Sequence, residues 1–398
     1  MKKYDFDRVI DRHGTHAAKI DRLDAMFGRH DLTPLWIADL DFAVCPEITA
    51  ALHARLDHPV LGYSDASESY WNSIIDWNRH RHGLELHRDE MAFIPGVVKG
   101  FALAVNYFTK PGDGVLIQPP VYTPFYTVVQ GNGRRVVENP LIFEDGKYRM
   151  DLEGLAELLR TEKPRMMILC NPHNPIGIQW DRETLARLAR LCREAGCTVV
   201  SDEIHGDLML HGRSHIPFLA AGEDAEAVGV MLGAPSKTFN IPGLVSSWMA
   251  VKNPELRKPF FKWLEVNEFS SPVMISVIGA EAAYRNGEAW LDEMLEYVED
   301  NIRFTREYIR ENIPGLSMVE PEASFLVWLD FRALNMCQKE IMEMLLDRAH
   351  LALNDGTMFG PQGAGFARLN VGTPRCVLRK ALESLRVAVL ETCGEPVS

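Results

Sequence analysis

Short apolar runs alternate with amphipathic stretches through the middle of the chain, from about residue 91 to residue 252. The apolar runs predict buried strands at residues 91–94, 115–118, 166–170, 198–202 and 228–232. The amphipathic stretches at 97–108 and 181–195 predict helices, the second with Asp181 as its N-cap and Gly196 as its stop. Strands that alternate with helices in this way form a mainly parallel, doubly wound sheet with both faces covered.

The two ends of the chain have a different pattern. After a helix at 46–56 and the alternating region, the sequence predicts a long helical stretch at 273–312, interrupted near Asn286, then strands at 324–329 and 366–371 and helices at 338–349 and 375–392. Residues 1–30 are polar and irregular. We therefore predict an α/β fold with a large domain at 48–283 and a smaller α+β domain made of 1–47, which includes an N-terminal arm, and 284–398.

Composition and charge exclude several classes of protein. Of the 398 residues, 46% are hydrophobic and 24% are charged, as in ordinary soluble domains. The formal net charge of −13, without any run of basic residues, argues against a nucleic-acid partner. The charged start of the chain lacks the apolar core of a secretory signal, and no apolar run approaches the length of a membrane span, so we expect no membrane partner.

Cysteine and histidine spacing gives no sign of a metal site. The seven cysteines show neither CxxC nor zinc-ligand spacing, which predicts reduced thiols in a cytoplasmic protein. The pairs His13 with His16 and His80 with His82 lack carboxylate or thiolate companions at ligand spacing. We therefore expect these histidines to be solvated or to cap helices, with no metal bound.

Lys237 follows the last strand of the alternating region, and ligands of parallel sheets bind beyond the carboxyl ends of the strands. A lysine that is partly desolvated at such a place has a lowered pKa and becomes a nucleophilic amine, able to form a Schiff base with an aldehyde. Its own segment, rich in Gly and Pro, fits a lysine of a surface loop equally well. The rest of the chain has to decide between the two.

Other strand ends carry polar or aromatic residues that suit pyridoxal 5′-phosphate (PLP). The turn before residue 97 opens a helix, whose free N–H groups bind phosphate, although an ordinary glycine turn would look alike. Tyr122, stiffened by prolines, could stack on a flat ring or simply pack. Asn174 is aimed outward by two Asn-Pro pairs. Asp202 ends a buried strand and needs a partner, either a pyridinium nitrogen or an arginine.

Several motifs resemble those of fold type I PLP enzymes of aminotransferase class I/II, and more closely the cystathionine β-lyases of the MalY/PatB type. They are Pro-Ser-Lys-Thr-Phe-Asn-Ile-Pro-Gly at 235–243, Ser-Asp-Glu-Ile-His at 201–205, Cys-Asn-Pro-His-Asn-Pro-Ile-Gly at 170–177, Pro-Val-Tyr-Thr-Pro-Phe-Tyr at 120–126, Asp-Arg-His-Gly-Thr at 11–15, Trp-Ile-Ala-Asp-Leu-Asp-Phe at 36–42, Gly-Tyr-Ser at 62–64 and Gly-Phe-Ala-Arg-Leu-Asn at 365–370. The resemblance spans nearly the whole chain.

The resemblance implies which residues hold the cofactor. Lys237 matches the lysine that forms the Schiff base, and Asp202 matches the partner of the pyridine nitrogen. Asn174 matches the donor to the phenolic oxygen, a contact that His205 would share where transaminases usually carry a tyrosine. Tyr122 matches the stacking ring.

The phosphate and the substrate have their own matching residues. The amides of Val97 and Val98 and the Ser236 hydroxyl match the phosphate cup. Tyr63 matches a tyrosine that reaches the phosphate of the neighbouring subunit, which implies a homodimer. Arg368 matches the residue that binds the α-carboxylate, and strand alternation puts Asn370 on its face. Ala38 matches a position near the substrate.

Three positions depart from the family pattern. Residue 234 is Ala where many relatives have Ser or Thr, and no arginine follows Lys237 at the distance usual in transaminases. Leu40 replaces the usual Met, a near-isosteric exchange that we expect to be silent.

The resemblance implies a β-elimination on L-cystathionine or a related cysteine S-conjugate, with Lys237 and Tyr122 as catalytic residues and Lys237 as the general base. The products would be a thiol (homocysteine, a precursor in methionine biosynthesis), pyruvate and ammonia. An aminotransferase on the same scaffold is the leading alternative, and a lyase with an added regulatory binding role is another.

Overall fold

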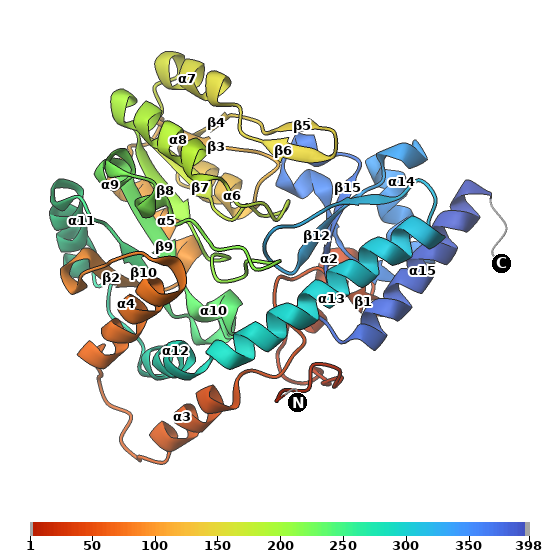
Figure 1. Cartoon of the computed structure of the whole chain (residues 1–398), viewed down its shortest axis with the longest axis horizontal. Coiled ribbons are helices and arrows are strands. Elements are labelled where there is room, and N and C mark those ends of the chain that lie inside the picture. Colours follow the sequence, from red (N-terminus) through yellow and green to blue (C-terminus); the bar gives the residue numbers. More distant parts are fainter. Residues whose placement is uncertain (1–2, 395–398) are drawn as a thin grey trace.

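The computed structural model describes residues 3–394 as two groups of sheets and helices joined by one long helix (Figure 1). The helices are α1 (Ala18–Asp21), α2 (Leu23–Phe27), α3 (Pro46–Leu56), α4 (Glu68–His82), α5 (Val97–Phe108), α6 (Pro124–Gly131), α7 (Leu152–Thr161), α8 (Arg182–Ala195), α9 (Glu223–Val228), α10 (Pro235–Thr238), α11 (Pro254–Val266), α12 (Met274–Asn286), α13 (Glu288–Asn312), α14 (Gln338–Glu343) and α15 (Arg375–Cys393). The strands are β1 (Thr33–Pro34), β2 (Met91–Ile94), β3 (Gly114–Ile117), β4 (Arg135–Glu138), β5 (Ile142–Glu144), β6 (Lys147–Arg149), β7 (Met166–Cys170), β8 (Thr198–Asp202), β9 (Gly229–Gly233), β10 (Ser247–Ala250), β11 (Ser317–Val319), β12 (Leu326–Asp330), β13 (Leu351–Ala352), β14 (Asn354–Asp355) and β15 (Phe366–Asn370).

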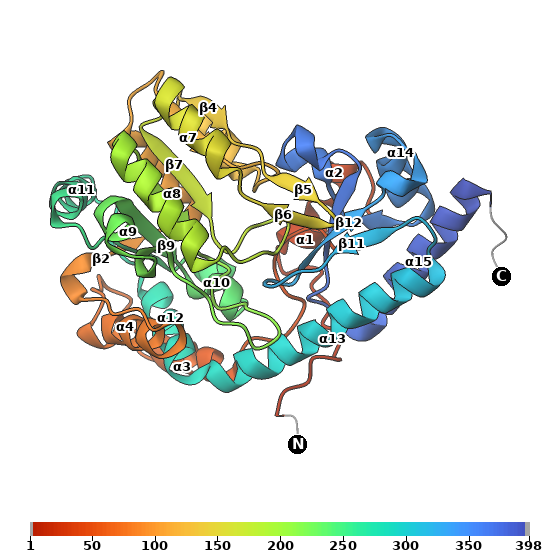
Figure 2. The ribbon, with the colours of Figure 1, turned by 45° about the horizontal axis from the view of Figure 1, so that its top comes forward.

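The larger group is built on a seven-stranded sheet in the order β2-β10-β9-β8-β7-β3-β4. Neighbouring strands are parallel except for β10, which is antiparallel to both of its neighbours. Strands β2, β3, β7 and β9 are mainly apolar because both faces of the sheet are covered. Helices α7 and α8 lie beside β7 on one face of the sheet (Figure 2). Met167 and Leu169 of β7 pack with residues of α7 and α8, while Met166 and Ile168 pack on the opposite face with α5 and α6. The predicted doubly wound sheet is confirmed.

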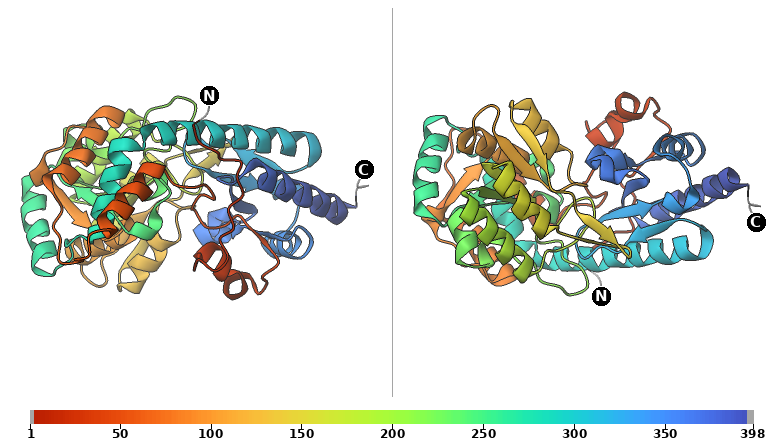
Figure 3. Two further views of the ribbon diagram at one scale, coloured as in Figure 1. Left: turned by 90° about the horizontal axis from the view of Figure 1, so that it is seen from below. Right: turned by 90° about the horizontal axis from the view of Figure 1, so that it is seen from above.

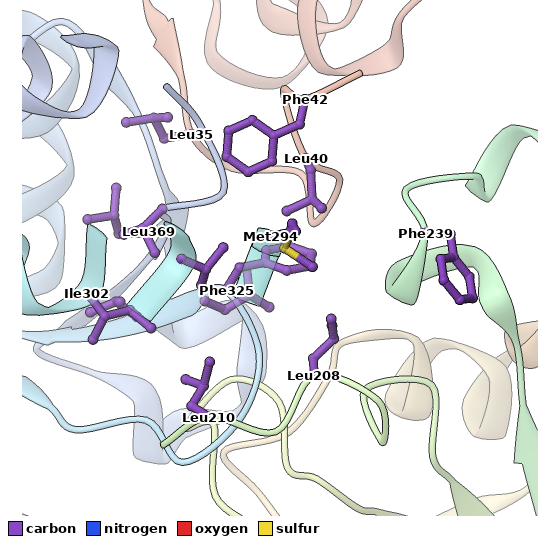
Figure 4. Close-up of a cluster of buried hydrophobic side chains, with 14 of the residues drawn as sticks. Leu35, Leu40, Phe42, Leu208, Leu210, Phe239, Met294, Ile302, Phe325 and Leu369 are labelled. Carbon is purple, nitrogen blue, oxygen red and sulfur yellow. The ribbon is translucent and has the colours of Figure 1, made fainter. Parts of the chain in front are cut away.

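The smaller group contains a four-stranded antiparallel sheet in the order β11-β12-β15-β14. The N-terminal arm joins this group because β1 pairs in parallel with β13. Helix α13 runs from one group to the other (Figure 3), and its buried face includes Met294 and Ile302. These two side chains belong to a hydrophobic cluster that also takes in Leu40, Phe42 and Phe325 (Figure 4).

Several local features differ from the sequence-based expectation, which also lacked helices α6, α7 and α11 and strands β4 and β10. The first 30 residues contain the short helices α1 and α2 rather than irregular chain only. Helix α4, which the pattern did not reveal, starts at Ser67, whose side chain accepts a hydrogen bond from the Tyr70 amide. The strand expected at 324–329 begins two residues later, since Ser324 has a φ of 76° and cannot extend the strand. The helix expected at 338–349 is α14 followed by a π-helical turn at Met344–Arg348.

None of the helices within residues 3–394 combines the length and the apolar composition needed to cross a membrane.

Candidate active site

The register of the large sheet brings several strand ends to one edge. Ile94 at the end of β2 pairs with Ser247, and Trp248, next to Ser247 on β10, pairs with Gly233 at the end of β9. Asp202 at the end of β8 pairs with Cys170 at the end of β7. The segments that follow these strands therefore meet at this edge, as expected for the ligand site of a parallel sheet.

Lys237 lies in the short helix α10, four residues beyond the end of β9. Its Nζ donates a hydrogen bond to the backbone oxygen of Ala38. Burial lowers the pKa of Lys237 to about 8, because the ammonium loses its hydration and Arg368 adds like charge, against the opposing attraction of Asp39. This lysine is therefore the desolvated amine that the sequence suggested and not a lysine of a surface loop.

Asp202 ends β8 as a buried carboxyl group. Its one hydrogen bond within residues 3–394 comes from the Ile204 amide, at 3.2 Å. Burial raises the pKa of Asp202 to about 7, and the neighbouring Glu203 adds to the rise. Within that part of the chain no arginine or lysine forms an ion pair with it, which leaves the position open for a cation.

Tyr122 and His205 are two further groups near Arg368. The Tyr122 ring interacts electrostatically with Arg368 and Asp202, and burial raises the pKa of its phenol. Its loop is fixed because the Val121 amide donates to the Phe359 carbonyl oxygen at 2.7 Å. His205 is buried, and burial lowers its pKa to about 3, so the ring is neutral at physiological pH.

Arg368 lies in the middle of β15, 5% exposed. Its guanidinium donates to three neutral oxygens: Asn174 Oδ1 at 2.9 Å, Asn354 Oδ1 at 2.6 Å and the Trp36 backbone oxygen at 3.0 Å. Burial lowers its pKa to about 10, which still leaves it cationic. Its Nε has no protein partner among the described residues. A buried cation without a carboxylate partner is a binding site for a small carboxylate.

The start of α5 fits an anion. Gly96 precedes the helix with a φ of 112°, a conformation that side-chain-bearing residues rarely adopt, and no side chain caps the helix there. The first N–H groups of a helix lack partners within the helix, so the amides of Val97 and Val98 are free to bind phosphate oxygens. Ser236, which precedes Lys237, is buried near the same edge.

Tyr63 is the predicted site residue that the fold does not bring to the others. It lies in the loop between α3 and α4 with its side chain 112% exposed relative to the reference state. Within one chain it forms no part of the site.

The sequence reasoning missed several residues that the fold places at the site. Asn354 and Phe359 both contact Arg368, the ring centroid of Phe359 lying 4.9 Å from the guanidinium carbon. No local pattern marked either residue. Asp39 faces Lys237, and its signal was present: two aspartates within a run of large apolar residues.

The expectation that His82 is solvated or caps a helix was wrong, because its side chain is buried against another side chain. Its side chain is 8% exposed, and its Nε2 lies 2.7 Å from Asp207 Oδ1. Asp207 also accepts a hydrogen bond from Thr238 Oγ1 at 2.7 Å, so it anchors the residue that follows Lys237. His13 and His80 are exposed, as expected. No group of three or more metal-ligating side chains occurs within residues 3–394.

The unsatisfied groups of the site fit PLP one by one. Asp202 suits the ring nitrogen, Asn174 and His205 Nδ1, which is buried without a protein partner in the described chain, suit the phenolic oxygen, and the start of α5 suits the phosphate. The Lys237 amine suits the aldehyde.

The chain is similar to known proteins along nearly its whole length. Residues 31–385 match the family described as aminotransferase class I and II. Cystathionine beta-lyase PatB of Bacillus subtilis (strain 168) is 41% identical over 384 residues, 96% of this chain and 99% of that protein. Cystalysin from Treponema denticola, whose crystal structure contains PLP, has a TM-score of 0.94 and 32% identity, covering 98% of this chain and 99% of that one. A PLP-bound putative aminotransferase from Clostridium difficile 630 has a TM-score of 0.93 and 36% identity, covering 97% of this chain and 100% of that one.

Proposed function

The chain belongs to the aminotransferase class I and II family, and from that premise we propose that it is a PLP-dependent carbon–sulfur β-lyase. Its substrate is L-cystathionine or a related cysteine S-conjugate, and its products are a thiol, pyruvate and ammonia. The observation that carries the proposal is a desolvated amine, Lys237, beside a buried guanidinium, Arg368, that lacks a carboxylate partner. The likeness to PatB over 96% of the chain favours the lyase reaction. With cystathionine the thiol is homocysteine, which would place the reaction in methionine biosynthesis.

The residues that hold PLP in this proposal are Lys237, Asp202, Asn174, His205, Tyr122, Val97, Val98 and Ser236, joined by Tyr63 from the partner subunit. When bound, PLP supplies an electrophilic aldehyde and a ring that withdraws electrons from the substrate Cα. Asp202 keeps a proton on the ring nitrogen, since a buried carboxylate is stable there only opposite a positive charge.

Arg368 binds the α-carboxylate of the substrate through its planar guanidinium and so fixes the direction of the Cα–H bond. Lys237 removes the Cα proton as general base and holds it at Nζ. A pKa of about 8 makes this amine an effective base near neutral pH. Tyr122 packs against the ring, and Ala38 borders the substrate. The β-thiolate then leaves and takes up a proton to give the thiol. The aminoacrylate that is released reacts with water to give pyruvate and ammonia.

An aminotransferase is the second candidate, favoured by the likeness to the putative aminotransferase from Clostridium difficile 630. The purified holoenzyme is incubated with L-cystathionine without any keto acid. Release of thiol and pyruvate supports the lyase. Amino transfer that requires a keto acid and releases no thiol would overturn it.

The proposal includes a homodimer with shared sites. Tyr63 is fully exposed, and it lines a groove of about 430 Å³ with the exposed Leu61 and Val273. Light scattering should give twice the mass of the 44.9 kDa chain. Mixed dimers of Tyr63→Ala and Lys237→Ala subunits should regain activity that neither variant has alone, because each mixed dimer rebuilds one complete site. Absence of regain would argue against the contribution of Tyr63 across the interface.

The proposal also includes the division into a domain at 48–283 and a second one made of 1–47 and 284–398. The seven-stranded sheet lies inside the first range and the four-stranded sheet inside the second, which supports it. All seven cysteines are unpaired, which supports a cytoplasmic location.

A further inference from the structure

Two cations and two carboxylates form a compact cluster behind the active site: Arg12, Lys19, Asp39 and Asp41, called here the charge quartet. Arg12 pairs with Asp39 at 2.7 Å and with Asp41 at 2.9 Å. Lys19 pairs with Asp41 at 2.9 Å and with Asp39 at 3.5 Å. Every member therefore contacts two members of opposite charge.

The quartet is mostly shielded from water. The Lys19 side chain is 0% exposed and that of Asp39 is 13% exposed. The segment that carries Lys19 is itself fixed, because Trp36 Nε1 donates to the Lys19 backbone oxygen at 3.0 Å. Well-packed apolar residues stabilise a buried site as well as ion pairs do or better, so stability alone does not explain charges at this place.

The two carboxylates belong to the segment 36–42, which crosses from the smaller group of elements to the larger. Asn370 Nδ2 donates to the backbone oxygens of Ile37 and Asp39, both at 2.7 Å. Asn240 accepts from the Leu40 amide at 3.0 Å and donates to the Phe42 oxygen at 2.9 Å. Leu40 and Phe42 point into the hydrophobic cluster of Figure 4. The quartet adds side-chain anchors to a backbone that is already held from two directions.

The same segment also contacts the active site. The Trp36 carbonyl oxygen accepts from Arg368 Nη2 at 3.0 Å, and the Ala38 carbonyl oxygen accepts from Lys237 Nζ. Asp39 attracts the Lys237 ammonium, and Lys19 repels it. The same short segment thus contacts the group that binds the carboxylate and the group that moves the proton.

We propose that Arg12, Lys19, Asp39 and Asp41 are positioning residues of the proposed lyase reaction. By fixing residues 36–41, they hold the Trp36 oxygen against Arg368 and the Ala38 oxygen, with the Asp39 carboxylate, against Lys237. The reaction that these residues would support is the one in the proposed function, whereas their contacts with residues 36–41 do not depend on it.

The test compares holoenzymes carrying Lys19→Met and Asp39→Asn. Each should lower kcat/KM for L-cystathionine about 10- to 100-fold, with KM rising and kcat falling, because Arg368 and Lys237 are both displaced. The pH at which the cofactor absorbance titrates is the second readout. The charged groups that face the Lys237 amine are Asp39, Asp202, Arg368 and Lys19. Loss of the Lys19 cation should move the midpoint up, and loss of the Asp39 charge should move it down.

Lys252→Met is the matched control, since Lys252 forms an ion pair with Glu226 at 2.7 Å outside the quartet, and it should leave both readouts unchanged. If Lys19→Met fails to fold, Arg12→Lys takes its place. Arg12 is 24% exposed, and a lysine lacks the planar donor fork that bridges Asp39 and Asp41, so kcat/KM should still fall.

Folded holoenzymes with kcat/KM within about twofold of the unsubstituted protein, or with midpoints that move in the same direction, would overturn the proposal. The absorbance titration requires bound PLP but not lyase chemistry. If the unsubstituted enzyme proved to be a transaminase, the proposed function would fail while the two midpoint shifts still tested the quartet.

Discussion

Two clusters of buried charge lie at the active site, and they are built in opposite ways. In the charge quartet, each of the four charges has two partners of opposite sign. In the other cluster, the Asp202 carboxyl and the Arg368 guanidinium have no ion-pair partner within residues 3–394. The paired cluster fixes the chain, whereas the unpaired one is open to ligands.

The two clusters differ in how they affect the stability of the fold. A buried charge without a partner destabilises the fold unless a ligand neutralises it, and such groups gather where a protein binds or catalyses. In the proposed enzyme, the cofactor nitrogen completes Asp202 and the substrate carboxylate completes Arg368. The quartet needs no ligand because it is complete by itself. Substitutions in the two clusters should therefore both lower activity, but those in the quartet should lower the stability of the cofactor-free protein more.

The largest effect is expected for Lys237→Ala. Turnover of L-cystathionine should fall by about 10³-fold or more, since the general base and the covalent attachment of the cofactor are both lost. Stopped assays for pyruvate measure it, and the cofactor absorbance should no longer report a Schiff base with the protein. The melting temperature of the cofactor-free protein should not fall. If the variant kept a tenth of the turnover, Lys237 would not be the general base.

The next largest effects are expected when one cation of each cluster is replaced by methionine, and these two variants should distinguish the clusters. Arg368→Met should lower kcat/KM about 10²-fold, mainly through KM, because hydrogen bonds to the charged carboxylate are lost. It should lower the stability of the cofactor-free protein less than Lys19→Met does, since the cation removed had no opposite charge and only hydrogen bonds to neutral oxygens are lost. Lys19→Met should lower the free energy of unfolding by about 3 kcal/mol, because it leaves buried carboxylates undercompensated. Chemical denaturation measures both, and equal losses would contradict the contrast.

Without the cofactor, the Asp202 carboxyl group should make the stability of the protein depend on pH. Its pKa rises from 3.8 to about 7 in the fold without ligand, so its contribution to stability is complete below about pH 4 and is lost as the pH rises through 7. The gain in melting temperature on PLP binding should thus be larger at pH 8 than at pH 5. Burial also lowers the pKa of His205 to about 3. We expect this to affect the stability of the protein with and without PLP alike, so that it largely cancels in the gain in melting temperature. In Asp202→Asn the pH dependence of the gain should shrink, and an unaltered dependence would contradict the assignment.

The smallest effect is expected for Leu40→Met. Leu40 is 2% exposed within the hydrophobic cluster, and the exchange conserves volume, so stability should change by less than about 1.5 kcal/mol. Steady-state kinetics should show kcat/KM within about twofold of the unsubstituted protein. A large fall would mean that packing at residue 40, and not the polar contacts of the segment, sets its position.

Local features of the chain were readable from the sequence because their causes lie within a few residues. The helix at 97–108 follows from its apolar spacing, and α8 begins at Asp181, whose side chain accepts from the Thr184 amide at 2.8 Å. Helix α4 was not predicted because tryptophan and histidine mask its amphipathic pattern. The start of the strand near residue 324 was predicted wrongly because it depends on the backbone angle of Ser324, which the pattern does not show.

The sequence by itself determined the alternation of strands and helices, the family resemblance and the identity of the candidate groups, Lys237, Asp202, Asn174 and Arg368. Only the tertiary structure decided what those groups meet. Lys237 contacts Ala38, 199 positions earlier in the chain, and Arg368 contacts Trp36, 332 positions earlier. Burial and neighbouring charge set the pKa of a side chain, and both come from segments distant in sequence, so the folded chain alone shows which charges are paired and which await a ligand.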